Sequence, residues 1–234
     1  MIRRLCLLAF VSLCILGLPA NAAQAVVTLA NGRHLVIVRP DGATTINGVV
    51  LLIPGGTTKL LLGPNGETNS ANFVIRTRRQ LLDAGFAVAY MDDPADLREP
   101  VQRLREIGHP VVFLSTSRGT IVAAANALRL ASDGPDLLIL TSPVTQGRDP
   151  IDQRPINQLK IPTLIVANDN DRCQVSPPSG AARLAERIGA TATYLHFSSS
   201  AQISAPCEAL APHGYLDIER PVIAAILEWI KKSS

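Results

Sequence analysis

The sequence predicts an α/β protein built on a doubly wound, mostly parallel sheet with little or no cap domain. Short, continuously apolar runs recur along the 234 residues, as is typical of parallel strands covered on both faces. Segments with apolar residues at helical spacing lie between these runs, and this alternation is typical of a doubly wound sheet. The segment 141–160 is short, so any lid over the sheet is small.

Eight strands and five helices follow from these patterns in chain order. The first two strands, 26–29 and 35–38, are joined by a turn at Asn31-Gly32. The later strands are 49–53, 86–91, 111–114, 137–140, 163–167 and 193–197. The helices are 71–84, a segment marked by Leu97, Val101 and Leu104, a segment after Ser117, 178–188, and a C-terminal segment marked by Val222, Ile223, Ile226, Leu227 and Ile230.

Two of these helices carry more detailed expectations. In the helix after Ser117, the side chains expected to face the core are Ile121, Ala124, Ala125 and Leu128. In the helix over 71–84, the three arginines Arg76, Arg78 and Arg79 are expected to form a solvated face.

Residues 1–22 are predicted to be a secretory signal peptide. Arg3 and Arg4 precede an apolar run over 5–18, and small residues then allow cleavage after Ala22 or, as second choice, after Ala25. The run is shorter than the roughly 20 apolar residues of a membrane span, which makes an uncleaved anchor the weaker alternative. We therefore expect one domain over 23–234, located in the periplasm or outside the cell.

Charge and cysteine content restrict the partners. Removal of the signal peptide lowers the formal net charge from +3 to +1, and no basic run remains that would indicate nucleic acid binding or stable membrane insertion. Cys173 and Cys207 remain in the exported chain, and one disulfide is the first interpretation, with two separate buried thiols as the alternative. Two cysteines and four scattered histidines predict no metal site, and nothing implies a cofactor.

The run V-V-F-L-S-T-S-R-G-T over 111–120 predicts a strand, a sharp turn and a helix, with Ser117 at the tip. Strand and helix pass close together in such a turn, so its neighbours must be small, and Ser115 and Gly119 are small. The turn lifts a hydroxyl out of the sheet and directs backbone N–H groups at the space above it. Ser117 is therefore a candidate nucleophile, the alternative being a serine-rich loop that caps a helix.

Three other loops also follow predicted strands, and two of them are considered first. In parallel sheets, reactive groups gather in the loops at the carboxyl ends of the strands. The glycines of Pro54-Gly55-Gly56-Thr57 would let the N–H of Gly56, or of Thr57, join the Arg118 N–H in an oxyanion hole, unless the segment is a simple turn. The loop N-D-N-D-R-C over 168–173 offers Asp171 and Asp169 as partners for an imidazole, and it lacks the glycine and glutamate of a calcium loop.

The segment A-P-H-G-Y over 211–215 contains His213, which is the candidate general base. His196 lies within a strand pattern and is expected to be packed. Nucleophile, acid and histidine thus occur in that order, each in a loop that follows a strand. This order is one of the three familiar orders of a catalytic triad and differs from the other two.

At this point the chain resembles the α/β-hydrolase family. The segments S-R-G-T at the turn, N-D-R-C in the acid loop and P-H-G at the histidine are similar to those of small secreted bacterial members, and the resemblance extends over 49–230. It implies that Ser117 is the nucleophile, Asp171 the acid and His213 the base, with Asp169 as second choice for the acid. Two departures, Ser115 in place of glycine and Pro54 in place of the histidine of many relatives, concern the oxyanion geometry.

The resemblance implies a secreted serine hydrolase that cleaves an ester-type bond, or an amide or a lactone, of a small-molecule substrate through an acyl-enzyme. An acyltransferase using the same site and a catalytically silent binding protein on the same fold are the alternatives. A bridge between Cys173 and Cys207 would tie the acid loop to the histidine loop and hold the two partners in register, unless it is a staple whose position is incidental.

Overall fold

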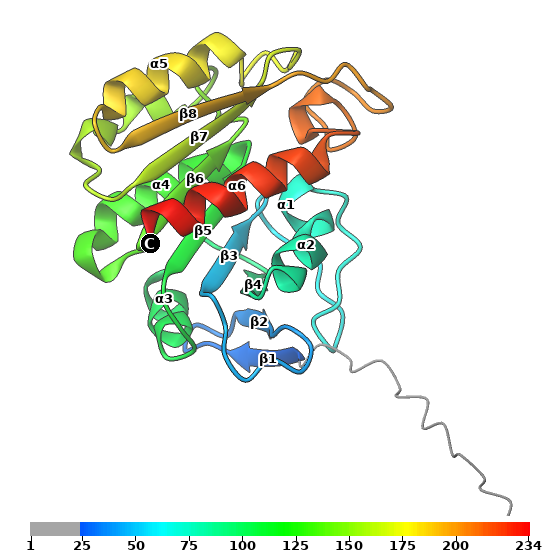
Figure 1. The fold of residues 1–234 in the computed structure, drawn as a ribbon, viewed down its shortest axis with the longest axis vertical. Helices are drawn as coiled ribbons and strands as arrows, with labels where there is room; N and C mark the ends of the chain where they lie inside the picture. The colour runs from blue at the N-terminus through cyan, green and yellow to red at the C-terminus, as the bar shows by residue number, and fades with distance from the viewer. Residues whose placement is uncertain (1–23) are drawn as a thin grey trace, which may run out of the picture.

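The computed structural model describes residues 24–234, which form an eight-stranded sheet with helices on both faces (Figure 1). The predicted signal peptide lies outside the described residues. The strands are β1 (Gln24–Thr28), β2 (His34–Val38), β3 (Val49–Ile53), β4 (Ala87–Met91), β5 (Val111–Thr116), β6 (Leu137–Thr141), β7 (Thr163–Asn168) and β8 (Ala192–Phe197). They lie in the order β1-β2-β4-β3-β5-β6-β7-β8. The strands from β4 to β8 pair in parallel, whereas β2 is antiparallel to both neighbours, so the sheet is mostly parallel as the sequence predicts.

The register of the central strands brings the loops of interest to one edge. Every residue of β3, β5, β6 and β7 is buried, which explains why their sequences are apolar without alternation. Ile53 at the end of β3 is aligned with Ser115 of β5, and Thr116 with Thr141 at the end of β6. The segments that follow β3, β5, β6 and β7 therefore all begin at the carboxyl edge of the sheet.

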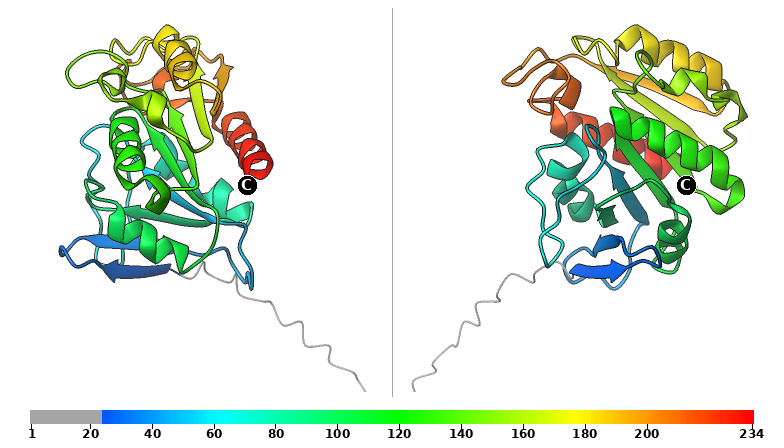
Figure 2. Two further views of the ribbon diagram at one scale, coloured as in Figure 1. Left: turned by 90° about the vertical axis from the view of Figure 1, so that its left-hand side faces the viewer. Right: turned by 180° about the vertical axis from the view of Figure 1, so that it is seen from behind.

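The helices form a layer on each face of the sheet. They are α1 (Phe73–Arg76), α2 (Arg78–Asp83), α3 (Arg98–Arg105), α4 (Arg118–Leu130), α5 (Pro178–Ile188) and α6 (Glu219–Ser233). One face packs against α3, α4 and α5 through residues such as Leu104, Ala124 and Leu184. The other packs against α1, α2 and α6, and Figure 2 shows α6 and α4 on opposite sides of the sheet. The predicted doubly wound architecture is confirmed.

The helix predicted over 71–84 is in fact two short helices that meet at Thr77. The Thr77 hydroxyl donates a hydrogen bond to the Phe73 carbonyl at 2.7 Å, within the last turn of α1. A threonine that bonds back to the preceding turn bends a helix, which fits the break between α1 and α2 at this residue.

The buried face of α4 is also rotated from the predicted one. The residues buried along it are Gly119, Thr120, Ala123, Ala124, Asn126, Ala127 and Leu130, whereas Ile121, Ala125 and Leu128 are only half-buried. Gly119 explains the rotation, because its backbone lies against the carbonyls of Ile53 and Pro54. Ala123 and Ala127 follow at intervals of one turn and share its face of the helix.

The segment between β6 and β7, where the sequence would place any lid, contains little regular structure. In the described segment between β6 and β7, the regular structure consists of the 3₁₀ helices η2 (Ile151–Gln153) and η3 (Ile156–Gln158), so the prediction of little or no cap agrees with the structure. Two more 3₁₀ helices, η1 (Ala131–Asp133) and η4 (Pro212–Gly214), lie elsewhere. Within residues 24–234, no helix combines the length and the apolar character needed to cross a membrane.

Candidate active site

Ser117 occupies the sharp turn between β5 and α4. Its backbone has φ 52° and ψ −128°, a conformation that residues with a side chain rarely adopt. The Ser117 N–H donates to the Thr141 carbonyl at 3.0 Å, which anchors the turn to the end of β6. The strained turn places the side chain at the carboxyl edge of the sheet, clear of the buried strand that precedes it.

Small residues around Ser117 are required by close backbone approaches. A Cβ atom on Gly119 would clash with the carbonyl oxygens of Ile53 and Pro54, and one on Gly55 would lie 2.7 Å from the Ser117 Cβ. Ser115 fits because its buried hydroxyl donates to the Ile139 carbonyl at 2.8 Å. The serine in place of glycine is thus accommodated by a hydrogen bond to the neighbouring strand.

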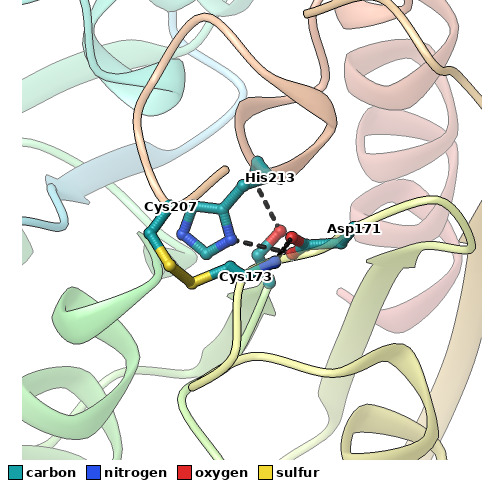
Figure 3. Close-up of a disulfide and its surroundings, with 5 residues drawn as sticks. Asp171, Cys173, Cys207 and His213 are labelled. Carbon is teal, nitrogen blue, oxygen red and sulfur yellow. Dashed lines mark hydrogen bonds and ion pairs between the residues drawn. A yellow bond between two sulfur atoms is a disulfide. The ribbon is translucent and has the colours of Figure 1, made fainter. Parts of the chain in front are cut away.

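The loop after β7 directs its two aspartates to different partners. Asp171 Oδ2 lies 2.8 Å from His213 Nδ1, and Asp171 Oδ1 accepts the Cys173 N–H at 2.8 Å (Figure 3). Both side chains of this pair are nearly inaccessible, with 2% of Asp171 and 4% of His213 exposed. In the tautomer whose Nδ1–H donates to Asp171, Nε2 of the neutral ring is an acceptor.

Asp169 is engaged elsewhere, on the molecular surface. Its Oδ2 lies 2.9 Å from His196 Nδ1, and about half of each side chain is exposed. The expectation that His196 is packed is therefore wrong. β8 is the edge strand of the sheet, and the imidazole stacks on Tyr194 with 5.8 Å between ring centroids and stays open to solvent.

The backbone around His213 is held by buried polar groups that the sequence analysis did not single out. Asn168 Nδ2 donates to the Pro212 carbonyl at 2.9 Å, and Ser142 Oγ donates to the His213 carbonyl at 2.8 Å. The buried Tyr215 hydroxyl accepts the Ser142 N–H at 3.0 Å and donates to the Val166 carbonyl at 2.9 Å. Burial raises the pKa of Tyr215, so the phenol remains a neutral donor.

Arg76 also holds this loop, and the prediction that it belongs to a solvated face is wrong. Its guanidinium donates to the Gly214 and Ala209 carbonyls and pairs with Glu219 at 2.8 Å, with 19% of its side chain exposed. Arg79 is exposed as predicted. The spacing of the arginines along the helix predicts a polar surface, but it does not indicate that Arg76 contacts the histidine loop.

Ser117 and His213 line one cavity of about 370 Å³ together with Gly55 and Gly56. Within the described residues no hydrogen bond joins the serine hydroxyl to the histidine, because His213 Nε2 is buried without a partner. An unpartnered ring nitrogen beside a cavity is available to a group that enters or rotates into it.

The residues expected to supply oxyanion donors lie close to Ser117. Arg118 is the first residue of α4, so its N–H has no acceptor within the helix. Gly56 has φ 67°, and both Gly56 and Thr57 line the cavity next to Ser117. Gly56, Thr57 and Arg118, whose N–H groups the sequence suggests as oxyanion donors, all line a cavity that Ser117 also lines.

A disulfide between Cys173 and Cys207 joins the acid loop to the segment that precedes His213 (Figure 3). Cys173 is buried, whereas Cys207 is exposed and lines the cavity. The bridge thus lies at the rim of the cavity, two residues from Asp171. In residues 24–234 no group of three or more His, Cys, Asp or Glu side chains is placed to hold a metal ion.

No protein-family model and no curated protein matches the chain, but solved structures match it over most of its length. An esterase from Rhizomucor miehei has a TM-score of 0.64 at 14% identity, covering 94% of this chain and 84% of that one. An esterase from Exiguobacterium antarcticum has a TM-score of 0.63 at 14% identity, covering 89% and 100%. A candidate dipeptidyl aminopeptidase IV from Bacteroides ovatus has a TM-score of 0.57 at 12% identity, and the match covers 91% of this chain but 35% of that one. With its strand order, this likeness shows that the chain has the α/β-hydrolase fold.

Proposed function

We propose that this protein is a serine hydrolase that cleaves an ester-type bond of a small-molecule substrate through an acyl-enzyme. The observation that carries the proposal is the Asp171–His213 pair, at 2.8 Å, beside a cavity that Ser117 also lines. A hydroxyl, an imidazole and a carboxylate arranged in this way are the parts of nucleophilic acyl transfer. The esterases that share the fold favour an ester substrate over an amide.

In the proposed mechanism, rotation of the Ser117 side chain brings its Oγ to His213 Nε2. The imidazole takes the hydroxyl proton while Oγ attacks the carbonyl carbon, and Asp171 stabilises the imidazolium that forms. The N–H groups of Arg118 and of Gly56, or Thr57, receive the negative charge that develops on the carbonyl oxygen. His213 then protonates the leaving oxygen, and a water molecule activated by the same ring hydrolyses the acyl-enzyme. In an acyltransferase, another acceptor would take the place of this water.

The test is labelling and turnover with a matched pair of serine variants. A fluorophosphonate probe should label the wild-type protein, and Ser117→Ala should abolish both labelling and hydrolysis of a panel of 4-nitrophenyl esters. Ser132→Ala, which removes an exposed hydroxyl at the far end of α4, should retain both. Labelling without turnover on esters, amides or lactones would favour an acyltransferase, and a folded protein that shows neither would favour a binding protein.

We also propose that the protein is exported to the periplasm or the medium. A disulfide fits an oxidising compartment, because reducing systems keep cytosolic thiols free. Cleavage after Ala22 leaves β1 whole, whereas cleavage after Ala25 removes Gln24 and Ala25, both of which pair with β2. We therefore favour Ala22, and mass measurement of the intact exported protein distinguishes the two sites.

A further inference from the structure

A second, larger cavity adjoins Ser117, and His213 is not among the residues that line it. It has a volume of about 940 Å³ and is lined by Gly56, Thr57, Ser117, Arg118, Ile121, Val144, Gln146, Arg148, Asp149, Val175 and Cys207. Four of these residues, Gly56, Thr57, Ser117 and Cys207, also line the 370 Å³ cavity. The two cavities therefore meet at the proposed nucleophile, and a substrate bonded to Ser117 would reach into the larger one.

The larger cavity carries an excess of positive charge. Within the described residues, neither Arg118 nor Arg148 has an ion pair or a side-chain hydrogen bond, and both are exposed. The acid on this wall, Asp149, is already neutralised by Arg154, whose two guanidinium nitrogens lie 3.0 and 3.3 Å from its oxygens. Arg154, by hydrogen bond and charge, and to a lesser degree the charge of Arg118, hold the pKa of Asp149 below its usual value. Among the described residues, the guanidinium groups of Arg118 and Arg148 therefore remain without an acidic partner at this wall.

The segment that bears Arg148 is fastened at both ends. The N–H groups of Thr145 and Gln146 both donate to the Val175 carbonyl, at 2.9 and 3.1 Å, and the Ile151 N–H donates to the Val144 carbonyl at 2.9 Å. Between these anchors, Gly147 and Asp149 have φ values of 91° and 59°. The backbone around Arg148 is thus held at the cavity wall by Val175, just beyond the acid loop, which reduces the ordering cost of binding there.

The smaller cavity has no comparable excess of charge. Its basic residue, Lys59, pairs with Asp93 at 3.1 Å, and its acidic residue, Glu208, is exposed. The excess of positive charge lies in only one of the two cavities that meet at Ser117. It can therefore distinguish a charged end of a substrate from a neutral one. A guanidinium group binds a carboxylate or a phosphate with two parallel hydrogen bonds, which a neutral ester cannot match.

We propose that Arg118 and Arg148 form a subsite for an anionic group, so that the preferred substrates are esters that carry a carboxylate or a phosphate a few bonds from the scissile carbonyl. This inference rests on the proposed function and adds the substrate class to it. The Arg118 side chain acts here independently of its backbone N–H, which belongs to the proposed oxyanion hole. The anion could lie on the acyl chain or on the alcohol, and the test treats these two sources separately.

The experiment compares two matched pairs of esters. Mono-4-nitrophenyl glutarate and 4-nitrophenyl pentanoate differ by a carboxylate on the acyl chain, whereas the butyrate esters of 4-hydroxybenzoate and of its methyl ester differ by a carboxylate on the alcohol. For each pair, the ratio of kcat/KM for the anionic ester to that for the neutral ester is measured. The variants are Arg148→Gln and Arg118→Gln, with Arg103→Gln, an exposed arginine of α3, as the matched control.

We expect Arg148→Gln and Arg118→Gln each to lower the ratio about five- to tenfold in one of the two pairs, the effect of losing a charge-assisted contact in a solvated site. Arg103→Gln should leave the ratio as in wild type. Raising the salt concentration from about 50 mM to about 500 mM should lower the wild-type ratio, because salt screens exposed charges. Ratios that are unchanged by both cavity variants in both pairs would overturn the subsite.

A binding measurement keeps the inference testable if no ester is hydrolysed, an outcome that would defeat the proposed function alone. Calorimetric titration of Ser117→Ala protein should show tighter binding of monomethyl glutarate than of dimethyl glutarate. The double variant Ser117→Ala with Arg148→Gln should bind the two compounds with equal affinity. Equal binding of the two compounds by Ser117→Ala protein would overturn the subsite independently of catalysis.

Discussion

The disulfide should be a large part of the stability of this protein. We consider a double variant, Cys173→Ala with Cys207→Ser, which removes the bridge without leaving a free thiol. The cysteines are 34 residues apart, and for a closed loop of this length the chain-entropy model gives about 4 kcal/mol. For a domain of about 210 residues this corresponds to a decrease in Tm of roughly 8–16 °C.

The same variant tests whether the bridge positions the proposed acid and base. The Cys173 N–H bonds Asp171, and Cys207 lies six residues before His213, so loss of the bridge frees one anchor of each loop. Other anchors remain, among them the Asn168 bond to Pro212. We therefore expect kcat, measured well below Tm, to fall by between a few-fold and the roughly 100-fold that a displacement of 1 Å can cost.

Thermal unfolding and ester hydrolysis are the assays, and a reductant supplies the control. Dithiothreitol should lower the Tm of the wild-type protein toward that of the double variant and leave the variant itself unaffected. A decrease in Tm of less than about 3 °C would refute the loop-entropy reasoning. An unchanged kcat would show that the bridge is only a staple and that the polar network around His213 positions the site without it.

The remaining predictions concern the loops around the cavity. Asp171→Asn should lower kcat by about 10⁴-fold, as loss of the acid has done in a well-studied triad, whereas Asp169→Asn should retain most activity; the opposite result in the ester assay would exchange their roles. Asn168→Ala leaves the buried Pro212 carbonyl without its donor, so it should lower the free energy of unfolding, measured in urea, by about 1–3 kcal/mol. It should also lower kcat, and a urea unfolding curve like that of the wild type would contradict this prediction. Gly119→Ala places a Cβ against the backbone of β3 and should lower stability by about 1–3 kcal/mol or more, measured as Tm; an unchanged Tm would mean that α4 can move away from β3.

Much of the fold can be predicted from the sequence because its signals are local. Runs of mostly apolar residues, interrupted by polar ones in β8, identify all eight strands to within about two residues at each end, and 178–188 is the whole of α5. The turn at Ser117 follows from an apolar run that ends in small residues, because only small side chains let strand and helix approach. The helix over 71–84 is predicted less well, because apolar spacing does not record the Thr77 hydrogen bond at the point where the helix divides.

Local patterns predict the strands, most of the helices and the loops that hold Ser117, Asp171 and His213, because these depend on neighbouring residues. Long-range pairing selects the aspartate that contacts His213 and brings Arg76 into contact with the histidine loop. These contacts join residues 42 and 138 positions apart, and no local period records them. The pairing of strand ends brings such residues together, so the site depends on the order of the strands in the sheet.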